Sequence, residues 1–413
     1  MRNAAALRRG QPVWCAEHED QRPTRRYPTL RGHRSCDVAI VGGGITGALI
    51  ADTFASEGVS VSVLESGCVG CGSTVASSAL LLQEPDSGLA HLARRYGHGA
   101  GRRIWQLSQD AVRHLVRRIR QQGIACDLVE RDTVYYATTT AAARRLRAEH
   151  QLRLRAGFDG NWLTPPDLCR LTGVPGRGAI RTRGNAQFNP YRACHGLMHA
   201  ASVAGADIFE RSAVTRIDDR RDGVRVYTRG GRVDASRVVI ATGYATTQFR
   251  PLAGRFRMYH TYVLATPPLS AVERRHVGMR DVMIWDTERP YHYARWTSDH
   301  RLLLGGADRP VRRGRQRGAQ FATATRELRT DFETILPALT GIDIEHAWEG
   351  LFAMTPDSLP YIGPHQRYPK HLFALGYGGN GMAFGALAAR LVFEQWQGVR
   401  SADQRLFSFG RLR

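Results

Sequence analysis

The chain has 413 residues, of which 43% are hydrophobic, and it carries a formal net charge of +21. The length suits two domains with sizeable cores, and the sequence contains no run approaching the ~20 apolar residues that a membrane-spanning helix requires. Because the N-terminal residues also lack the apolar core of a signal peptide, we expect a cytoplasmic protein without a transmembrane segment.

The positive charge comes almost entirely from arginine, since Lys370 is the only lysine. A basic chain can bind nucleic acid, but these arginines are spread along the whole sequence. Around Ile104–Ile119 they alternate with an apolar helical face. A solvated face is the simpler interpretation, so nucleic acid is not an expected partner. The seven cysteines make no metal-ligand spacing with the histidines, and we predict no metal site.

The first predicted unit follows an N-terminal surface arm of residues 1–35 and combines two strands with a helix. Asp37–Val41 and Val61–Leu64 are short runs rich in β-branched residues, which is typical of buried strands. Between them, Ala48–Ser56 has helical spacing. The order of strand, helix and strand predicts a parallel sheet of the Rossmann type.

The turn between the first strand and the helix follows the pattern G-x-G-x-x-G. Gly42 permits the tight turn, Gly44 lets a pyrophosphate approach the backbone, and Gly47 lets helix and strand pack closely. The helix N-terminus favours an anion through its free N–H groups and its dipole. Glu65, at the end of the second strand, is placed to accept hydrogen bonds from a ribose diol. These features together predict a dinucleotide-binding site.

A loop rich in glycine and serine begins at Gly67. Its small residues would allow a bulky ligand to approach closely, with Ser73 and Thr74 available as hydrogen-bonding groups; a helix N-cap explains Ser73 equally well. The pair Cys68-x-x-Cys71 has three open interpretations: a redox dithiol, a covalent attachment point for a cofactor, or two thiols in a reducing compartment.

The rest of the chain predicts a return to the first sheet and a second domain. Residues 89–184 are mostly helical in pattern, with a strand near Thr133–Ala137 and breaks at Gly173–Gly178. Strands from Phe256 to Asp308 alternate with turn signals, which predicts an antiparallel sheet. We assign the nucleotide-binding domain to 36–88, 185–250 and 346–400, the second domain to 89–184 and 251–345, and a tail to 401–413. Further predicted elements are strands at Ser212–Ile217 and Arg237–Ile240, a turn at Thr355–Gly363, and helices at Tyr191–Val203, Phe321–Leu336 and Met382–Trp396.

Three separated motifs carry a family resemblance: the first strand–helix–strand unit, VVIATG at 238–243, and TPDSLPYIG at 355–363 with ALGYGGNGM at 374–382. The chain resembles the FAD-dependent oxidoreductases of the D-amino-acid oxidase superfamily, and its N-terminal layout is most similar to the γ-glutamylputrescine oxidase branch, near sarcosine and dimethylglycine oxidases. The implied fold class is α/β, with a Rossmann-like FAD-binding domain and a second α+β substrate domain built on an antiparallel sheet.

The resemblance implies FAD as the cofactor. A helix beginning near Met382 would direct its N–H groups at the flavin pyrimidine edge, where reduction leaves negative charge. The position of a flavin-linking histidine in dimethylglycine dehydrogenases aligns with Ala76, so we expect non-covalent FAD, with attachment through Cys68 or Cys71 left open. The expected cofactor-binding residues are Gly42, Gly44, Ile45, Thr46, Gly47, Glu65, Gly72, Ser73, Thr74, Val214, Thr242, Gly243, Gly379, Asn380, Gly381 and Met382.

The implied reaction is the oxidation of an amine or amino acid. A hydride passes from the C–H bond next to nitrogen to flavin N5, and water hydrolyses the imine. The candidates on the substrate side are Tyr262, Tyr291, His292, Tyr293 and Arg295. Of these, Arg295 would hold a carboxylate through two parallel hydrogen bonds. Sheet packing with Arg295 at the surface explains the same alternation. The acceptor that reoxidises the flavin, oxygen or another compound, is left open. The only lysine of the chain, Lys370, lies in a polar turn and does not decide between them.

Two other functions stay open at this level. The same fold supports oxidation of a hydroxy compound such as glycerol phosphate, and the basic charge would suit an RNA-associated or non-catalytic flavoprotein subunit. Only the G-x-G-x-x-G at 42–47 lies between two predicted strands with an acid after the second, and the lack of another such unit disfavours an NAD(P)H-dependent disulfide reductase. The substrate, the choice between oxidase and dehydrogenase, and the oligomeric state are left open.

Overall fold

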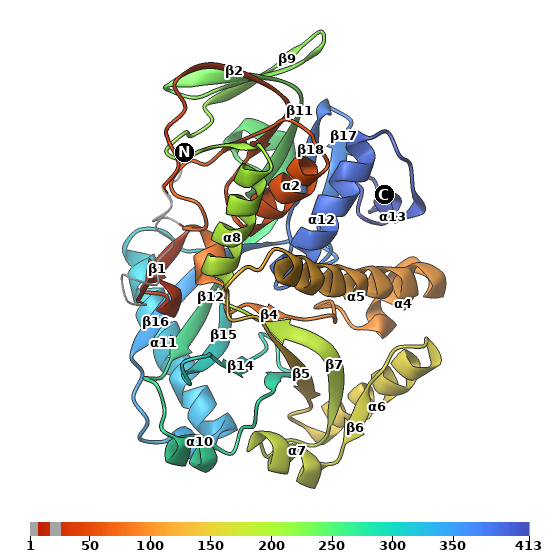
Figure 1. The fold of residues 1–413 in the computed structure, drawn as a ribbon. Helices are drawn as coiled ribbons and strands as arrows, with labels where there is room; N and C mark the ends of the chain where they lie inside the picture. Colours follow the sequence, from red (N-terminus) through yellow and green to blue (C-terminus); the bar gives the residue numbers. More distant parts are fainter. Residues whose placement is uncertain (1–6, 17–25, 413) are drawn as a thin grey trace.

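The structure is a computed structural model that describes residues 7–16 and 26–412. Within these residues the strands form two sheets, one of eight strands and one of ten. Figure 1 shows the eight-stranded sheet in the upper half and the ten-stranded sheet in the lower half, with the long helix α5 (His98–Gln121) at the level between them. This arrangement confirms the predicted fold class. No helix in the described part of the chain has the length and apolar character needed to cross a membrane.

The eight-stranded sheet is the Rossmann-like part of the fold. Its strands are β2 (Gly32–Val41), β3 (Val61–Leu64), β8 (Asp207–Phe209), β9 (Arg216–Arg220), β10 (Gly223–Tyr227), β11 (Gly231–Gly243), β17 (Tyr361–His365) and β18 (Tyr368–Leu375). The neighbouring strands β18, β11, β2, β3 and β8 pair in parallel, while β17 pairs antiparallel to β18, and β10 joins β9 to β11. Val38, Ala39 and Ile40 in β2 are fully buried, as expected for a parallel strand covered on both faces.

Three helices cover one face of this sheet. The helix α2 (Ile45–Ser56) packs between α8 (Pro190–Val203) and α12 (Gly381–Trp396), as Figure 1 shows. In α5, the predicted apolar face is confirmed, because Ile104, Leu115 and Ile119 are at most 1% exposed. The shorter helices in this half are α3 (Ser73–Ala76), α4 (Leu89–Tyr96), α9 (Arg250–Ala253) and α13 (Ala402–Leu406).

The ten-stranded sheet is antiparallel except at one parallel pair, β13 with β5. Its strands are β1 (Arg8–Gly10), β4 (Leu80–Leu81), β5 (Val129–Tyr136), β6 (Asn161–Leu163), β7 (Ala179–Gln187), β12 (Arg257–Ala265), β13 (Met283–Asp286), β14 (Tyr293–Trp296), β15 (Leu302–Pro310) and β16 (His346–Met354). The helix α11 (Arg315–Ile335) packs against β12 and β15. The remaining helices are α1 (Val13–Ala16), α6 (Thr140–Arg155), α7 (Pro165–Thr172) and α10 (Ala271–Val277).

Several elements differ from the sequence expectation. The described part of the N-terminal segment is not a surface arm, because β1 pairs with β16 and Trp14 is only 4% exposed. Strand β7 interrupts the region expected to be mostly helical, since its polar residues hide the period of two. The predicted strand Ser212–Ile217 begins instead at Arg216. Strand β16 lies within residues 346–400, which were assigned to the nucleotide-binding domain, but it belongs to the ten-stranded sheet. The predicted domain limits stay predictions.

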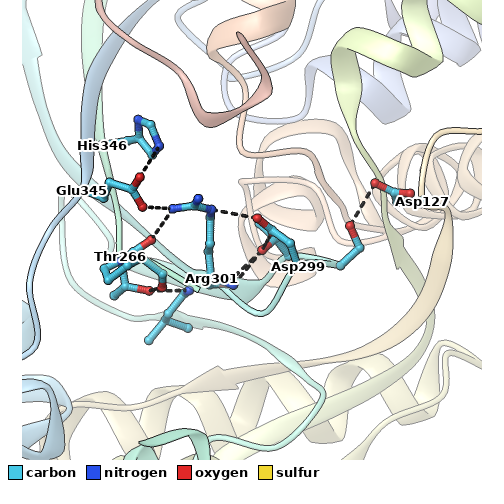
Figure 2. A network of polar contacts seen from close by, with 10 residues as sticks. Asp127, Thr266, Asp299, Arg301, Glu345 and His346 are labelled. Carbon is cyan, nitrogen blue, oxygen red and sulfur yellow. Dashed lines mark hydrogen bonds and ion pairs between the residues drawn. The ribbon is translucent and has the colours of Figure 1, made fainter. Parts of the chain in front are cut away.

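The turn between β14 and β15 is held by the charged network that Figure 2 shows. Arg301 Nε donates to Asp299 Oδ2 at 2.8 Å and Nη1 donates to the Thr266 carbonyl oxygen at 3.1 Å. The same guanidinium pairs with Glu345, which precedes β16. Arg301 therefore ties this turn to the ends of two neighbouring strands of the sheet.

Candidate cofactor and substrate site

A cavity of about 750 Å³ is lined by residues from both sheets. Val41, Leu64 and Gly243 line it, and these residues end three neighbouring strands of the parallel sheet. Open parallel sheets bind their ligands outside the carboxyl ends of the strands. Met258 and Phe352, from β12 and β16 of the other sheet, line the same cavity. The cavity thus joins the ends of the parallel strands to one face of the ten-stranded sheet.

The glycine turn after β2 leaves no room for larger side chains. Gly42 has a φ of +113°, and a Cβ there would lie 2.6 Å from the Ala241 carbonyl oxygen. A Cβ on Gly47 would lie 1.9 Å from the Gly42 carbonyl oxygen. Gly42 and Gly44 line the cavity, whereas Gly47 lies outside its lining and brings α2 close to β2. This arrangement has the geometry of a pyrophosphate-binding turn.

Glu65 follows β3 directly and lines the cavity. Its Oε2 accepts from the Gly43 N–H at 2.7 Å, and its Oε1 accepts from the Gly67 N–H at 2.6 Å and from Ser66 Oγ at 3.0 Å. A carboxylate offers about four acceptor positions. The side chain is therefore held in place and still has acceptor capacity for a ligand hydroxyl.

The short helix α3 connects the glycine turn to the second sheet. Thr74 Oγ1 accepts from the Ile45 N–H at 2.9 Å, and Ser73 Oγ donates to the Leu351 carbonyl oxygen at 2.7 Å. One N–H group at the start of α2 is therefore satisfied by the protein itself. Except for Gly47, the expected cofactor-binding residues all line the cavity, including Thr46, Gly72, Val214, Thr242, Gly381 and Met382.

The glycine-rich segment before α12 forms hydrogen bonds with the segment between β4 and α4. Asn380 Nδ2 donates to the Glu84 carbonyl oxygen at 2.9 Å, and Asn380 Oδ1 accepts from the Asp86 N–H at 2.8 Å. The Gly379 N–H donates to Asp86 Oδ2 at 2.8 Å. Asn380 is thus used to position residues 84–86, a role that the sequence did not suggest.

A polar cluster lies beside this segment and lines the same cavity; we call it the Asp86–Asp308 cluster, and its members are Asp86, Thr261, Tyr291, Tyr293 and Asp308. The Tyr291 hydroxyl donates to Asp86 Oδ1 at 3.4 Å, and the hydroxyls of Tyr293 and Thr261 are 3.3 Å apart. Thr261 also forms a side-chain hydrogen bond with Asp308. Of these five residues, sequence reasoning selected Tyr291 and Tyr293 for the site.

Burial perturbs the acidity of this cluster. It raises the pKa of Asp308 to about 6, and the charge of Asp86 acts in the same direction while Thr261 opposes it. Burial also raises the pKa of Asp86, against the opposing effects of the Gly379 N–H and the Arg289 charge. The pKa of Tyr293 is raised to about 12 by burial and by Asp308. Such perturbed groups in a cleft are typical of functional sites.

Of the five substrate-side candidates, Tyr291 and Tyr293 line the cavity, whereas Tyr262, His292 and Arg295 do not. His292 is instead paired with Asp286 and Asp331. Tyr262 follows Thr261 in β12 and points to the opposite face of the sheet, where its ring centroid lies 6.2 Å from that of Phe321. Arg295 is 2% exposed, so it is not at the surface either. The expected contact between these three residues and a substrate therefore has no geometric support.

Arg295 instead donates to the backbone. Its Nε donates to the Ser78 carbonyl oxygen at 2.6 Å, its Nη2 to that of Phe188 at 2.9 Å, and its Nη1 to that of Trp296 at 3.4 Å. Its guanidinium carbon lies 5.1 Å from the centroid of the Trp14 ring. Because Ser78 lines the cavity, Arg295 holds part of the cavity wall in place.

Only one cysteine of the Cys68–Cys71 pair lines the cavity. Cys68 lines it, whereas Cys71 does not, and burial raises the pKa of the Cys71 thiol to about 11.

In residues 7–16 and 26–412, no group of three His, Cys, Asp or Glu side chains is arranged to hold a metal ion. Sequence reasoning did not select Asp86, Trp285 or Asp308 for the site, since nothing in the local pattern distinguishes them from other turn and strand residues.

Comparisons with known proteins agree with this geometry. The family model for FAD-dependent oxidoreductases known as DAO matches residues 37–395. The chain is 26% identical over 403 residues to the probable oxidoreductase OrdL of Haemophilus influenzae, covering 94% of this chain and 88% of that protein. It is 27% identical over 392 residues to the gamma-glutamylputrescine oxidoreductase of Escherichia coli, again covering 94% and 88%.

The solved structure of the glycine oxidase from Geobacillus kaustophilus has a similar fold. The alignment has a TM-score of 0.75 and 25% sequence identity, and it covers 92% of this chain and 99% of that structure. The family match, the length of these alignments and the glycine turn at the cavity all lead to the same assignment. The chain belongs to the DAO family of FAD-dependent oxidoreductases.

Proposed function

We propose that this enzyme oxidises an amine or an amino acid at the carbon next to nitrogen, with FAD bound in the cavity of about 750 Å³. The observation that carries this proposal is that one cavity reaches from the glycine turn and Glu65 to the Asp86–Asp308 cluster. A cofactor held at one end would therefore share the cavity with a substrate held at the other.

The residues present fit FAD. In this proposal the N-terminus of α2 and the turn at Gly42 and Gly44 bind the pyrophosphate, and Glu65 binds a ribose diol. Gly381 and Met382 begin α12 and line the cavity, so that the positive end of this helix faces the flavin ring. Bound FAD would supply the hydride acceptor for the C–H bond next to the substrate nitrogen, and water would hydrolyse the imine product.

The protein groups orient the substrate and hold its proton. Tyr291 and Tyr293 keep their hydroxyl protons at neutral pH, because burial raises the pKa of both. Burial raises the pKa of Asp308 to about 6, so its carboxylate is a stronger base than that of an exposed aspartate. Asp308 is therefore suited to accept a proton from the substrate ammonium and leave a neutral amine.

The relatives support an amine or amino-acid substrate without choosing between them. Their names describe a gamma-glutamylputrescine oxidoreductase at 27% identity and a glycine oxidase at 25% identity. Among the described residues that line the cavity there is no lysine, arginine or histidine. A phosphate-bearing substrate such as glycerol phosphate would find no basic side chain in this lining, and the N-terminus of α2 is already assigned to the cofactor pyrophosphate.

An anaerobic screen tests the proposal. Purified enzyme is mixed without oxygen with amines, amino acids and hydroxy acids, and the visible absorbance of oxidised flavin is followed. We expect at least one amine or amino acid to bleach the flavin, with release of the carbonyl product and an amine or ammonia. Reduction by hydroxy compounds alone would contradict the proposal.

A further inference from the structure

We propose that the substrate end of the cavity recognises a cation, so that the substrate is an amine whose bound portion carries no carboxylate. This inference rests on the proposed function, because it concerns the same cavity. It is narrower, since an amino-acid substrate would satisfy the proposed function and contradict this inference.

The first observation is the charge of the cavity lining. Its described residues include four acids, Glu65, Glu84, Asp86 and Asp308, and no basic side chain, although the chain as a whole has a net charge of +21. Glu65 is occupied by backbone N–H groups of its own loop. Glu84 lies near Arg153, whose Nη1 is 4.0 Å from Glu84 Oε1. Asp86 and Asp308 remain as the acids of the substrate end.

The second observation is that neither Asp86 nor Asp308 forms a close ion pair with a described residue. No ion pair within 4.0 Å involves either side chain in the described part of the protein, and Asp86 accepts only from the neutral donors Gly379 and Tyr291. Asp308 Oδ1 is buried and accepts no hydrogen bond from the described residues. A buried carboxylate without a counter-charge is costly, and a cationic ligand would remove that cost.

The third observation is the aromatic wall beside these acids. Trp285, Tyr291 and Tyr293 line the cavity, and the Tyr291 ring centroid is 6.0 Å from that of Trp285 and 6.0 Å from that of Tyr293. Aromatic faces attract ammonium groups, most strongly where water is excluded. The acids and the rings therefore favour the same ligand charge, and two acids at this end would repel a carboxylate.

Arg289 and His292 are the basic residues to consider against this assignment. The charge of His292 acts on Asp308, but its ring nitrogens are paired with Asp286 and Asp331. The Arg289 guanidinium carbon lies 5.6 Å from the centroid of the Tyr291 ring, but the side chain is exposed and does not line the cavity. Arg295 has its donors on backbone carbonyl oxygens. An anionic substrate group at this end would have Arg289 as its partner, so this residue belongs in the test.

The test uses FAD-loaded enzyme and two non-reacting probes of opposite charge. Tetramethylammonium and acetate are titrated into the oxidised enzyme, and binding is followed through the perturbation of the flavin spectrum. We expect tetramethylammonium to bind with saturation and acetate not to bind. Asp308→Asn and Asp86→Asn should each weaken tetramethylammonium binding by about tenfold or more, which corresponds to about 1.4 kcal/mol. Asp110→Asn, at an exposed position, is the matched control and should leave binding unchanged.

Two results would overturn the inference: acetate binding that is lost in Arg289→Gln, or tetramethylammonium binding that is equal in wild type and in both cavity variants. Each variant's FAD content is measured first. Because Asp86 contacts the Gly379 backbone, Asp308→Asn decides the matter if Asp86→Asn loses its flavin. Neither probe is oxidised, so the outcome does not depend on whether the proposed reaction occurs.

Discussion

The Asp86 carboxylate accepts a 2.8 Å hydrogen bond from the Gly379 backbone N–H, across 293 residues of sequence. Asn380 reinforces this link, because it accepts from the Asp86 N–H and donates to the Glu84 carbonyl oxygen. Asp86, an acid of the Asp86–Asp308 cluster, is thereby held against the glycine-rich segment that precedes α12. A change in the glycine-rich segment is therefore expected to move Asp86, which we propose contacts the substrate.

Replacing Glu65 with alanine should weaken FAD binding more than it alters the chemistry of bound flavin. A hydrogen bond from a ribose hydroxyl to a charged group contributes roughly 1.5–3 kcal/mol, and the two backbone N–H groups of this loop lose their acceptor as well. The apparent FAD affinity is measured by reconstitution of the apoprotein. Glu57→Ala, on the exposed end of α2, is the control. An unchanged affinity in Glu65→Ala would remove Glu65 from the ribose site.

Replacing Arg295 with methionine should destabilise the protein rather than change its choice of substrate. The three carbonyl oxygens that accept from Arg295 would lose their donor, and each unsatisfied buried group costs about 1–3 kcal/mol. The free energy of unfolding in urea measures this loss. Arg113→Met, at an exposed position, should change it by at most about 0.5 kcal/mol. Normal stability together with a raised KM for a carboxylate substrate would restore the substrate role of Arg295.

The titration of Asp308 should be visible in the stability of the protein. Burial raises the pKa of Asp308 in the folded state from the ordinary value of 3.8 to about 6; Thr261 and His292 oppose this shift, and Asp86 adds to it. Because the folded state binds this proton more tightly than the unfolded chain, the contribution of Asp308 to stability falls as the pH rises from about 4 to about 6.

Asp308→Asn should therefore raise the Tm at about pH 8, with a smaller gain at about pH 5. The Tm is measured by thermal unfolding at both pH values, with Asp110→Asn as the control. A Tm that falls at the higher pH would show that the Asp308 carboxylate is stabilising, in disagreement with its burial.

The flavin should be released when the protein is precipitated with acid. The family resemblance implies that Ala76 stands where dimethylglycine dehydrogenases have a flavin-linking histidine, and an alanine side chain could not form such a bond. The measurement is the absorbance of the supernatant and of the redissolved polypeptide. Flavin that stays on the polypeptide would direct attention to Cys68, because this thiol lines the cavity and Cys71 does not.

The sequence predicted the nucleotide-binding half well because its signals are local. The turn from Gly42 to Gly47 and the acid at Glu65 depend on the backbone of one short segment, and the structure brings Glu65 and most of the turn into the cavity lining, with Gly47 outside it. The substrate side could not be predicted in the same way. Asp86 and Asp308 belong to segments far apart in the chain, and only the packing of the two sheets brings them to one cavity.

Arg295 shows the other limit of sequence reasoning. Its strand has the alternation expected of a half-buried sheet, and that pattern cannot tell whether a buried guanidinium meets a ligand or backbone carbonyl oxygens. The structure places Arg295 against the backbone because the turn at Ser78 and the end of β7 converge behind the cavity wall. Trp14, from the N-terminal segment, completes this environment.

The most direct test of the central claim compares two substrates that differ in one terminal group, which is an ammonium in one and a carboxylate in the other. A linear diamine and the ω-amino acid of the same chain length are each mixed anaerobically with the FAD-loaded enzyme, and the rate constant of flavin reduction is measured. We predict that the diamine reduces the flavin at least about tenfold faster, a difference of roughly 1.4 kcal/mol in activation free energy. Faster reduction by the amino acid, or no reduction by any amine, would contradict the claim that this cavity oxidises a cationic amine.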